Sequence, residues 1–470
     1  MKKFIKDNKL LILFILVLIS FCLFSMIFVT YESDYFWHIK AGEYMVKHHV
    51  ILTKDVFSWN LAGKYWFSHE WLFEIILYKL YQLFGNLHIY IYIFMCYLVL
   101  LLSIFIPHRK EYLKNIPFSL VWLTMSIVLI HFLQARPHLL TFILISLLIY
   151  ILFDLYNNEN SKKIYYIPLI SLLWVNIHGG SSNLVYILPI LFIISGLFNF
   201  NFSKIESKRY SKKQFLKYLL CVVLGFIPLL INPHGLRMIT YPYVNMSNSL
   251  MISSISEWQP SNLNDIQHYM FFIIAFIIFM IMFISKKKIR LIDFILFLAG
   301  LYLGLKSIRF WPFIYIFMSH SIFYYINKRK VDPGTNIILL ILSIICILVF
   351  ASNTSLLKLK PIKIVSDKAI NILKKEKPKR LYNYYDYGGY LIYKDIDVSI
   401  DGRADLYSEY NYKDYLNIYY LNYNYNKLLK KYSFDYFIIP RKSELFTYLS
   451  ENNKYVNIYK DKKVCIFKLK

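Results

Sequence analysis

The residues that could do chemistry gather in short segments beside apolar stretches of the chain. Asp34 stands beside Trp37 and His38, and His69-Glu70 follows further along the chain. A carboxylate in such a setting can act as a general base when a substrate hydroxyl lies within hydrogen-bonding distance. The alternative for Asp34 is a solvated loop acid or a helix cap, and for His69-Glu70 it is a structural hydrogen-bonded pair. Two further acids are weaker candidates of the same kind: Glu32 and Asp55.

Arginine is scarce in this chain, because only 10 of its 54 basic residues are Arg. A planar guanidinium can bind phosphate or carboxylate through two parallel hydrogen bonds, which Lys cannot do. Arg136, Arg237 and Arg309 stand at the ends of apolar stretches, and His138 and His178 occupy similar positions. We expect these residues to bind an anionic group. For each Arg the alternative is a side chain that extends to the lipid headgroups.

The C-terminal part of the chain adds Asp401-Gly402-Arg403, a pattern suited to binding hydroxyl groups. Its alternative is an internal salt-bridged turn. His and carboxylate side chains together suit divalent ions. A divalent metal therefore stays open as a cofactor, although no HExxH spacing occurs and no cofactor is certain. The chain has no P-loop and no Gly-x-Ser-x-Gly, so ATP-driven transport and serine hydrolysis have no support.

The elements that position these residues follow from composition. Of the 470 residues, 57% are hydrophobic and only 17% are charged, yet the formal net charge is +26. The mean hydropathy is +0.44. Because the basic residues form short clusters between long apolar stretches, the sequence indicates a membrane protein and excludes a nucleic-acid partner. The excess of Lys over Arg also resembles the drift of an AT-rich genome.

Eleven apolar stretches of roughly 15–20 residues are candidate transmembrane spans. The loops between them alternate between Lys/Arg-rich and Lys/Arg-poor, which predicts a cytoplasmic N-terminus and an extracytoplasmic C-terminus. The chemically rich residues then lie on the outer side. The predicted spans are 11–30, 87–106, 117–134, 139–154, 165–178, 184–200, 218–232, 269–285, 291–305, 310–327 and 335–352.

The remaining segments predict two domains. Residues 1–352 form the transmembrane domain, with a first outer loop over 31–70 and an amphipathic interfacial helix over 69–84. Residues 353–470 form a small extracytoplasmic α/β domain. In that domain, β-like runs are expected at 397–400, 435–440, 455–459 and 464–469, and helices at 389–394, 410–421 and 443–449.

The motifs as a set resemble those of a bacterial family of polytopic membrane proteins that is similar to the GT-C superfamily of glycosyltransferases. The resemblance runs over nearly the whole chain. It rests on Asp34-x-x-Trp37-His38, Asp55-x-Phe57-Ser58, His69-Glu70-Trp71-Leu72, Asn176-x-His178-Gly179-Gly180, Asn232-Pro233-x-Gly235, Glu257-Trp258, Asp386-x-Gly388-Gly389-Tyr390 and Asp401-Gly402-Arg403.

This resemblance implies a GT-C-like helical membrane protein that transfers a sugar from a polyprenyl-phosphate donor to an extracytoplasmic glycan, lipid or protein acceptor of the cell envelope. In that superfamily the first outer loop carries the catalytic acid, and Asp34 is the matching position here. A non-enzymatic glycan or lipid transporter and an envelope-assembly scaffold are the alternatives. The expected substrate-binding residues are Trp37, His38, Asp55, His69, Glu70, Arg136, His138, His178, Arg237, Arg309, Asp401 and Arg403.

Overall fold

The computed structural model describes residues 9–29, 32–112, 129–245, 255–326, 333–353, 363–407 and 409–470. The chain divides into two compact units, each assembled from segments that are far apart in the sequence. Unit 1 comprises Met1–Thr30, Ile89–Pro242 and Ile255–Lys358, and unit 2 comprises Tyr31–His88, Tyr243–Ser254 and Leu359–Lys470. The first outer loop of the sequence interpretation therefore groups with the C-terminal segment.

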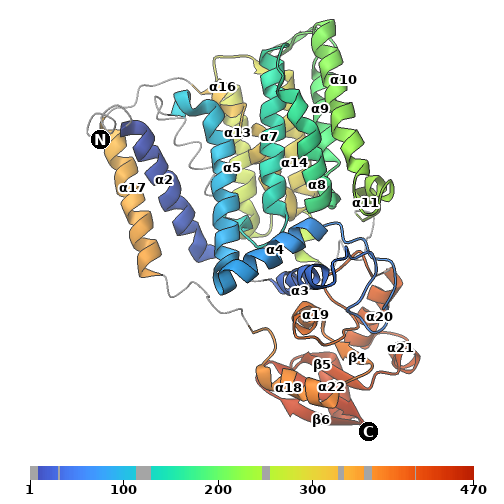
Figure 1. Ribbon diagram of the computed structural model, residues 1–470. Helices are drawn as coiled ribbons and strands as arrows, with labels where there is room; N and C mark the ends of the chain where they lie inside the picture. Colours follow the sequence, from blue (N-terminus) through green and yellow to red (C-terminus); the bar gives the residue numbers. More distant parts are fainter. Residues whose placement is uncertain are drawn as a thin grey trace. The chain divides into compact units, whose positions relative to one another are not determined.

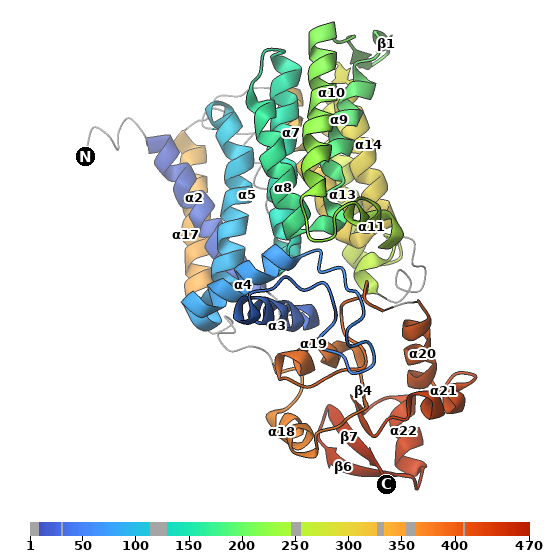
Figure 2. The ribbon, with the colours of Figure 1, turned by 45° about the vertical axis from the view of Figure 1, so that its right-hand side comes forward.

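Unit 1 is a bundle of apolar helices (Figure 1). In the two ribbon views α7, α8, α9, α10 and α14 run side by side, and α2 packs against α17 (Figure 2). Its core contains Tyr97, Trp174, Phe192 and Tyr218. The main helices are α2 (Lys9–Ser25), α5 (His88–Tyr112), α7 (His138–Asn157), α8 (Ile167–Ile177), α9 (Leu184–Ser195), α10 (Lys212–Phe226), α11 (Arg237–Asn245), α13 (Tyr269–Ile284), α14 (Leu291–Lys306), α15 (Trp311–Met318), α16 (Ile322–Tyr325) and α17 (Pro333–Ser352).

Among the described residues, three helical segments are long and apolar enough to cross a membrane: Trp71–His108, His138–Asn157 and Lys212–Leu230. The prediction of eleven spans is not supported. Several of the predicted spans form shorter helices. For example, α8 has 11 residues, and α9 has 12 with Pro189 inside it. Proline and short 3₁₀ turns end or interrupt such helices before they reach the roughly 20 residues of a span. Residues 117–128 of one predicted span lie outside the described residues.

Two pairs of helices in unit 1 are joined by a small sheet at one end of the bundle. β1 (Phe200–Phe202) pairs with β2 (Ile205–Ser207) in an antiparallel hairpin between α9 and α10. β2 also pairs in parallel with β3 (Ile289–Arg290), which lies between α13 and α14. This sheet therefore fixes the ends of four helices relative to one another.

Unit 2 combines one helix of the first outer loop, α3, and the following helix, α4, with a four-stranded sheet of order β4-β5-β7-β6. β4 and β5 are parallel, whereas β7 runs antiparallel to both β5 and β6. α3 packs against α4 and against α19, and α22 contacts β5 and β6. The elements are α3 (Ser33–His48), α4 (Trp71–Phe84), α18 (Asp367–Glu376), β4 (Leu381–Asn383), α19 (Tyr385–Tyr393), α20 (Glu409–Tyr419), α21 (Tyr425–Tyr432), β5 (Tyr436–Pro440), α22 (Glu444–Glu451), β6 (Tyr455–Lys460) and β7 (Val464–Leu469).

Three of the four predicted strands of the C-terminal segment are confirmed, as β5, β6 and β7. The predicted strand over 397–400 is wrong, since only Val398 makes a single bridge, to Ser58 of the first outer loop. That bridge joins two distant loops instead of extending the sheet. The helix expected over 69–84 is present as α4, and its interfacial location stays a prediction, as do the domain boundaries and the sides of the two termini.

Candidate functional site

Asp34 lies in the first turn of α3, which begins at Ser33 after the N-cap residue Glu32. A carboxylate is favoured there because the helix dipole and the free amide groups of the first turn attract negative charge. The Asp34 carboxylate accepts a hydrogen bond from Trp37 Nε1 at 3.3 Å, and its side chain remains partly exposed. Asp34 is therefore an acid of the first turn and not the helix cap, and its side chain is neither fully buried nor fully exposed.

Two glycines let the C-terminal segment approach this turn closely. A Cβ atom on Gly402 would stand 1.8 Å from Asp34 Oδ1, and one on Gly389 would stand 2.3 Å from the carbonyl oxygen of Ser33. A side chain at position 389 would clash with backbone, whereas one at position 402 would force the Asp34 carboxylate to move. The Gly388-Gly389 and Asp401-Gly402-Arg403 motifs therefore serve to pack α19 and the 400–403 turn against the start of α3.

A buried charge network of Asp55, Asp401, Arg403 and Tyr407 holds that turn. Arg403 Nη1 donates to Asp55 Oδ1 at 2.6 Å, and its Nε and Nη2 donate to the two oxygens of Asp401 at 2.9 and 2.7 Å. Tyr407 donates to Asp401 Oδ2 at 2.6 Å. The side chains of Asp55 and Arg403 are both 0% exposed. This geometry favours the internal salt-bridged turn over direct substrate binding.

Neighbouring backbone amides and aromatic rings also stabilise the charges of Asp55 and Arg403. The backbone amides of Phe57 and Ser58 donate to Asp55 at 3.1 Å, and the guanidinium of Arg403 lies over the rings of Phe57 and Trp66. Desolvation lowers the pKa of Arg403, but attraction to Asp401 and Asp55 outweighs it and raises that pKa above its usual range. Arg403 is therefore permanently charged, and it fixes the first outer loop to the C-terminal segment.

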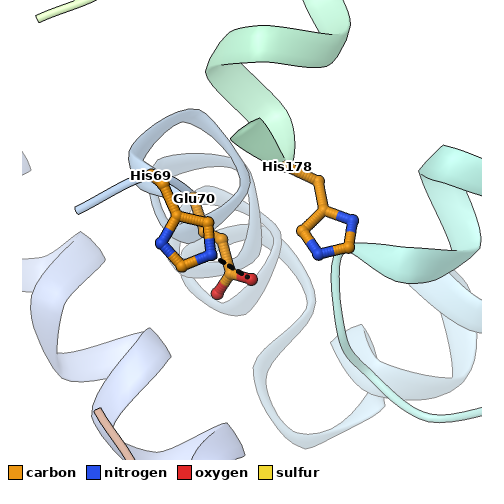
Figure 3. A group of neighbouring side chains, drawn as sticks. All are labelled: His69, Glu70 and His178. Atoms are coloured by element: carbon orange, nitrogen blue, oxygen red, sulfur yellow. Dashed lines mark ion pairs between the residues drawn. The ribbon is translucent and has the colours of Figure 1, made fainter. Parts of the chain in front are cut away.

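A second group, the acid–histidine cluster, consists of His38, His69, Glu70, Glu74 and Asp405. Its members alternate between carboxylate and imidazole. His38 lies 3.3 Å from Glu74 and 3.5 Å from Glu70, and His69 Nε2 lies 3.2 Å from Glu70 (Figure 3). His69 Nδ1 is also 4.0 Å from Asp405 Oδ2. The ring of His38 stacks on Trp37, with 3.6 Å between ring centroids, so this cluster adjoins the residue that bonds Asp34.

The charge state of the cluster follows from its pairing. Burial favours the neutral imidazole of His69, but attraction and hydrogen bonding to Glu70 outweigh it and raise the pKa of His69 to about 9. Burial raises the pKa of Asp405, and the nearby His69 only partly offsets that rise. The His69–Glu70 pair is thus an ion pair at neutral pH, as the structural alternative proposed.

The same cluster offers a donor set for a cation. One ligand atom each from His38, Glu70 and Glu74 lies within 4.8 Å of the others. Imidazole and carboxylate suit several divalent metals, whereas Mg²⁺ prefers oxygen alone. Within the described part of unit 2, these three side chains are the best-matched site for the divalent metal that the sequence left open.

Unit 1 contains its own charged group, the arginine cluster of Arg136, Glu257 and Arg309. Arg136 Nη1 donates to both carboxylate oxygens of Glu257 at 3.0 Å. Arg309 stacks over Trp258 at 4.9 Å. Burial raises the pKa of Glu257, but Arg136 and Arg309 outweigh it and lower it to about 2. Two cations therefore act on the same carboxylate.

The other predicted binding residues of unit 1 lie around helix ends. His138 begins α7 and donates from Nε2 to the carbonyl of Phe132 at 2.8 Å. His178 follows α8, is buried, and hydrogen-bonds Thr141 at 2.7 Å. Arg237 begins α11 and is exposed. Asn176 donates to the carbonyl of Ile231 at 3.0 Å, which links the end of α8 to the segment just before Asn232.

Sequence reasoning missed three members of these groups: Glu74, Asp405 and Tyr407. Glu74 stands one helical turn after Glu70, so the two share a helix face, and this spacing was the available signal. Asp405 and Tyr407 follow Asp401 in a turn without regular spacing. No local pattern marks them.

No protein-family model matches the sequence, and no curated protein matches it either. Solved structures do match. At 11–12% sequence identity, this similarity is one of fold.

The particular neighbours are structures of the oligosaccharyltransferase AglB from Archaeoglobus fulgidus. The structure tethered to an acceptor peptide with the NVT sequon gives a TM-score of 0.56 at 12% identity, covering 93% of this chain and 70% of that one. The apo form gives 0.53 at 11% identity with the same coverage. The complex with an inhibitory peptide and dolichol-phosphate gives 0.56 at 11% identity, again over 93% and 70%.

Proposed function

We propose that this protein is a membrane glycosyltransferase that moves a sugar from a polyprenyl-phosphate donor to an extracytoplasmic acceptor of the cell envelope. The observation that carries the proposal is the partly exposed Asp34 carboxylate, fixed at the start of α3 by Trp37 and Gly402 within a GT-C-like fold. An isolated solvated acid would not need two distant segments to enclose it.

In the proposed reaction Asp34 takes the proton of the acceptor group as that group attacks the anomeric carbon of the donor. The new glycosidic bond forms while the bond between the sugar and the lipid phosphate breaks. The phosphate leaves with the bonding electron pair, and positively charged groups stabilise the developing charge. Asp55, Asp401 and Arg403 act as positioning residues, because they hold Gly402 against Asp34.

The arginine cluster is the proposed site for the donor phosphate. The proposal rests on two guanidinium groups, Arg136 and Arg309, that act on the same carboxylate, Glu257, and hold its pKa at about 2. A phosphate can also accept parallel hydrogen bonds from a guanidinium. Dolichol-phosphate, named in one AglB complex, is a lipid phosphate of this chemical class.

The test is transfer of labelled sugar from a polyprenyl-phosphate donor in membranes that contain the full chain, compared with Asp34→Asn. Asp367→Asn is the matched control, since Asp367 also lies in the first turn of a helix but on an exposed surface. We expect Asp34→Asn to lose transfer by roughly 10²–10⁴-fold, the range of a general base. Normal transfer by Asp34→Asn at normal expression would contradict the proposal.

The same membranes are assayed after chelation and after Mn²⁺ is added back, because His38, Glu70 and Glu74 match a divalent cation. Arg136→Gln and Arg309→Gln test the donor site separately. We expect them to weaken donor binding, measured with labelled polyprenyl phosphate, more than Arg380→Gln, which changes an exposed Arg of unit 2.

A further inference from the structure

The β1–β2 hairpin of unit 1 exposes three phenylalanines within five residues. Phe198, Phe200 and Phe202 are 73%, 42% and 70% exposed, and no residue of β1 is buried. A hairpin in water normally alternates apolar and polar side chains so that one face packs on a core. Phe200 and Phe202 share one face of β1, with 6.4 Å between their ring centroids, and both remain exposed instead of packing on a core. An exposed group of aromatic rings of this kind indicates an apolar or interfacial environment.

Exposed cations surround these rings. Lys208 and Arg209 follow β2, Lys212 and Lys213 begin α10, and Lys286–Lys288 precede β3. The acids nearby are few: Glu206 in β2 and Glu159, which accepts a hydrogen bond from Ser211. Rings flanked by many cations and few acids form a surface that is both apolar and positively charged.

The hairpin is fixed in place. β2 pairs with β1 on one side and β3 on the other, and Lys288 donates to Asn201 Oδ1 at 2.6 Å. Tyr210, which ends the connection to α10, hydrogen-bonds Ser195 at 3.0 Å and stacks on Tyr218. The hairpin is therefore held at the end of the bundle, and its strand β1 lies near the end of α10 (Figure 2).

We propose that this surface binds the headgroups of anionic phospholipids, with the three rings inserted at the boundary between headgroups and acyl chains. Aromatic side chains are favoured at that depth, and Lys and Arg extend from it to the phosphates. Attraction to an anionic bilayer rises with each cation near its surface. The inference is independent of the proposed glycosyl transfer, because none of these residues belongs to the groups described above.

The experiment measures thermal unfolding of the purified full chain in detergent with added phosphatidylglycerol or phosphatidylcholine, and counts bound lipids by native mass spectrometry. We expect phosphatidylglycerol to raise the melting temperature more than phosphatidylcholine, and 0.5 M salt to reduce that excess through screening. Equal effects of the two lipids on the unaltered protein would overturn the proposal.

Two variants test separately the contribution of the lysine charges and that of the inserted phenylalanine rings. In Lys286→Gln/Lys287→Gln/Lys288→Gln the apparent affinity for phosphatidylglycerol should fall by tenfold or more, at roughly fivefold per cation. Phe198→Ser/Phe202→Ser should lose stabilisation by both lipids. The control Lys374→Gln/Lys375→Gln/Lys379→Gln removes three exposed lysines of unit 2 and should behave as the unaltered protein. An equal loss in this control, or no loss in the first variant, would contradict a site at the hairpin.

Discussion

The buried charge network and the acid–histidine cluster occupy the same unit and use the same kinds of residue, but their charges are satisfied differently. In the network, Arg403 bonds Asp55 and Asp401, and backbone amides and Tyr407 complete the carboxylates. In the cluster, acids and imidazoles alternate at 3.2–4.0 Å, and the pKa values of His69 and Asp405 are raised from their ordinary ones.

This difference distinguishes a structural role from a role in chemistry or binding, although both groups contain the same types of residue. Charges that are wholly buried and fully paired fix a shape, and breaking one pair leaves an uncompensated buried charge. Titratable groups whose pKa values are shifted by burial and by specific partners are instead typical of sites for chemistry or binding. Asp34 lies between the two groups, since Gly402 of the network's turn touches it and Trp37 connects it to His38.

Removing the cation of the network should give the largest effect. Arg403→Met leaves Asp55 and Asp401 buried without their partner, so the free energy of unfolding should fall by about 3–5 kcal/mol. Thermal unfolding in detergent measures the loss, with the exposed Arg380→Met as the control. A loss below about 1 kcal/mol would show that the network does not hold the unit together.

The acid–histidine cluster should instead make the free energy of unfolding depend on pH. The pKa of folded His69 is about 9 against an ordinary value of 6.5, so its contribution is complete below pH 6.5 and is lost as the pH rises through 9. A shift of this size corresponds to up to about 3 kcal/mol. The stability difference between the unaltered protein and His69→Gln should therefore shrink between pH 6 and pH 10.

His48→Gln, at the exposed end of α3, serves as the control for that titration. A difference between the unaltered protein and His69→Gln that stays constant over this pH range would mean that His69 is not held in its protonated form.

The contact between the network's turn and Asp34 can be tested on its own. Gly402→Ala places a Cβ where Asp34 Oδ1 now lies, so the carboxylate must move. Displacement of a catalytic group by about 1 Å costs on the order of 10²-fold in rate. We expect transfer to fall by that factor with a smaller change in melting temperature than Arg403→Met, while Ala404→Ser in the same turn stays active.

An exposed ion pair of unit 2 should have the smallest effect. Lys40 Nζ lies 2.5 Å from Asp395, whose side chain is 66% exposed. Surface pairs of this kind contribute about 0–1 kcal/mol. Asp395→Asn should therefore change the melting temperature very little. An effect as large as that of Arg403→Met would remove the distinction between buried and exposed pairs on which the comparison rests.

The sequence predicted elements with a strong local pattern. Strands β5, β6 and β7 follow runs of aromatic and β-branched residues, and α4 follows an amphipathic repeat. α3 was not predicted, because its polar and aromatic residues give little helical periodicity. The spans were overestimated, since apolar composition does not reveal where prolines and 3₁₀ turns shorten a helix.

The candidate site was predicted as a set of residues and not as an arrangement. Asp34, His38, Glu70 and Arg403 all stood out by type, but the pairing of Arg403 with Asp55 joins residues 348 positions apart. No local pattern encodes such a contact. The contact between Gly402 and Asp34 is not encoded by a local pattern either. The sequence shows a glycine at position 402, and only the fold shows that a side chain there would meet the Asp34 carboxylate.

The most direct test of this account compares Asp34→Asn with Asp55→Asn in one preparation, with sugar transfer and melting temperature measured together. If Asp34 is the catalytic base and Asp55 a positioning residue, Asp34→Asn loses transfer by roughly 10²-fold or more with an almost unchanged melting temperature. Asp55→Asn lowers the melting temperature, and Asp55→Glu partly restores both properties. Full transfer by a stably folded Asp34→Asn protein would contradict the account.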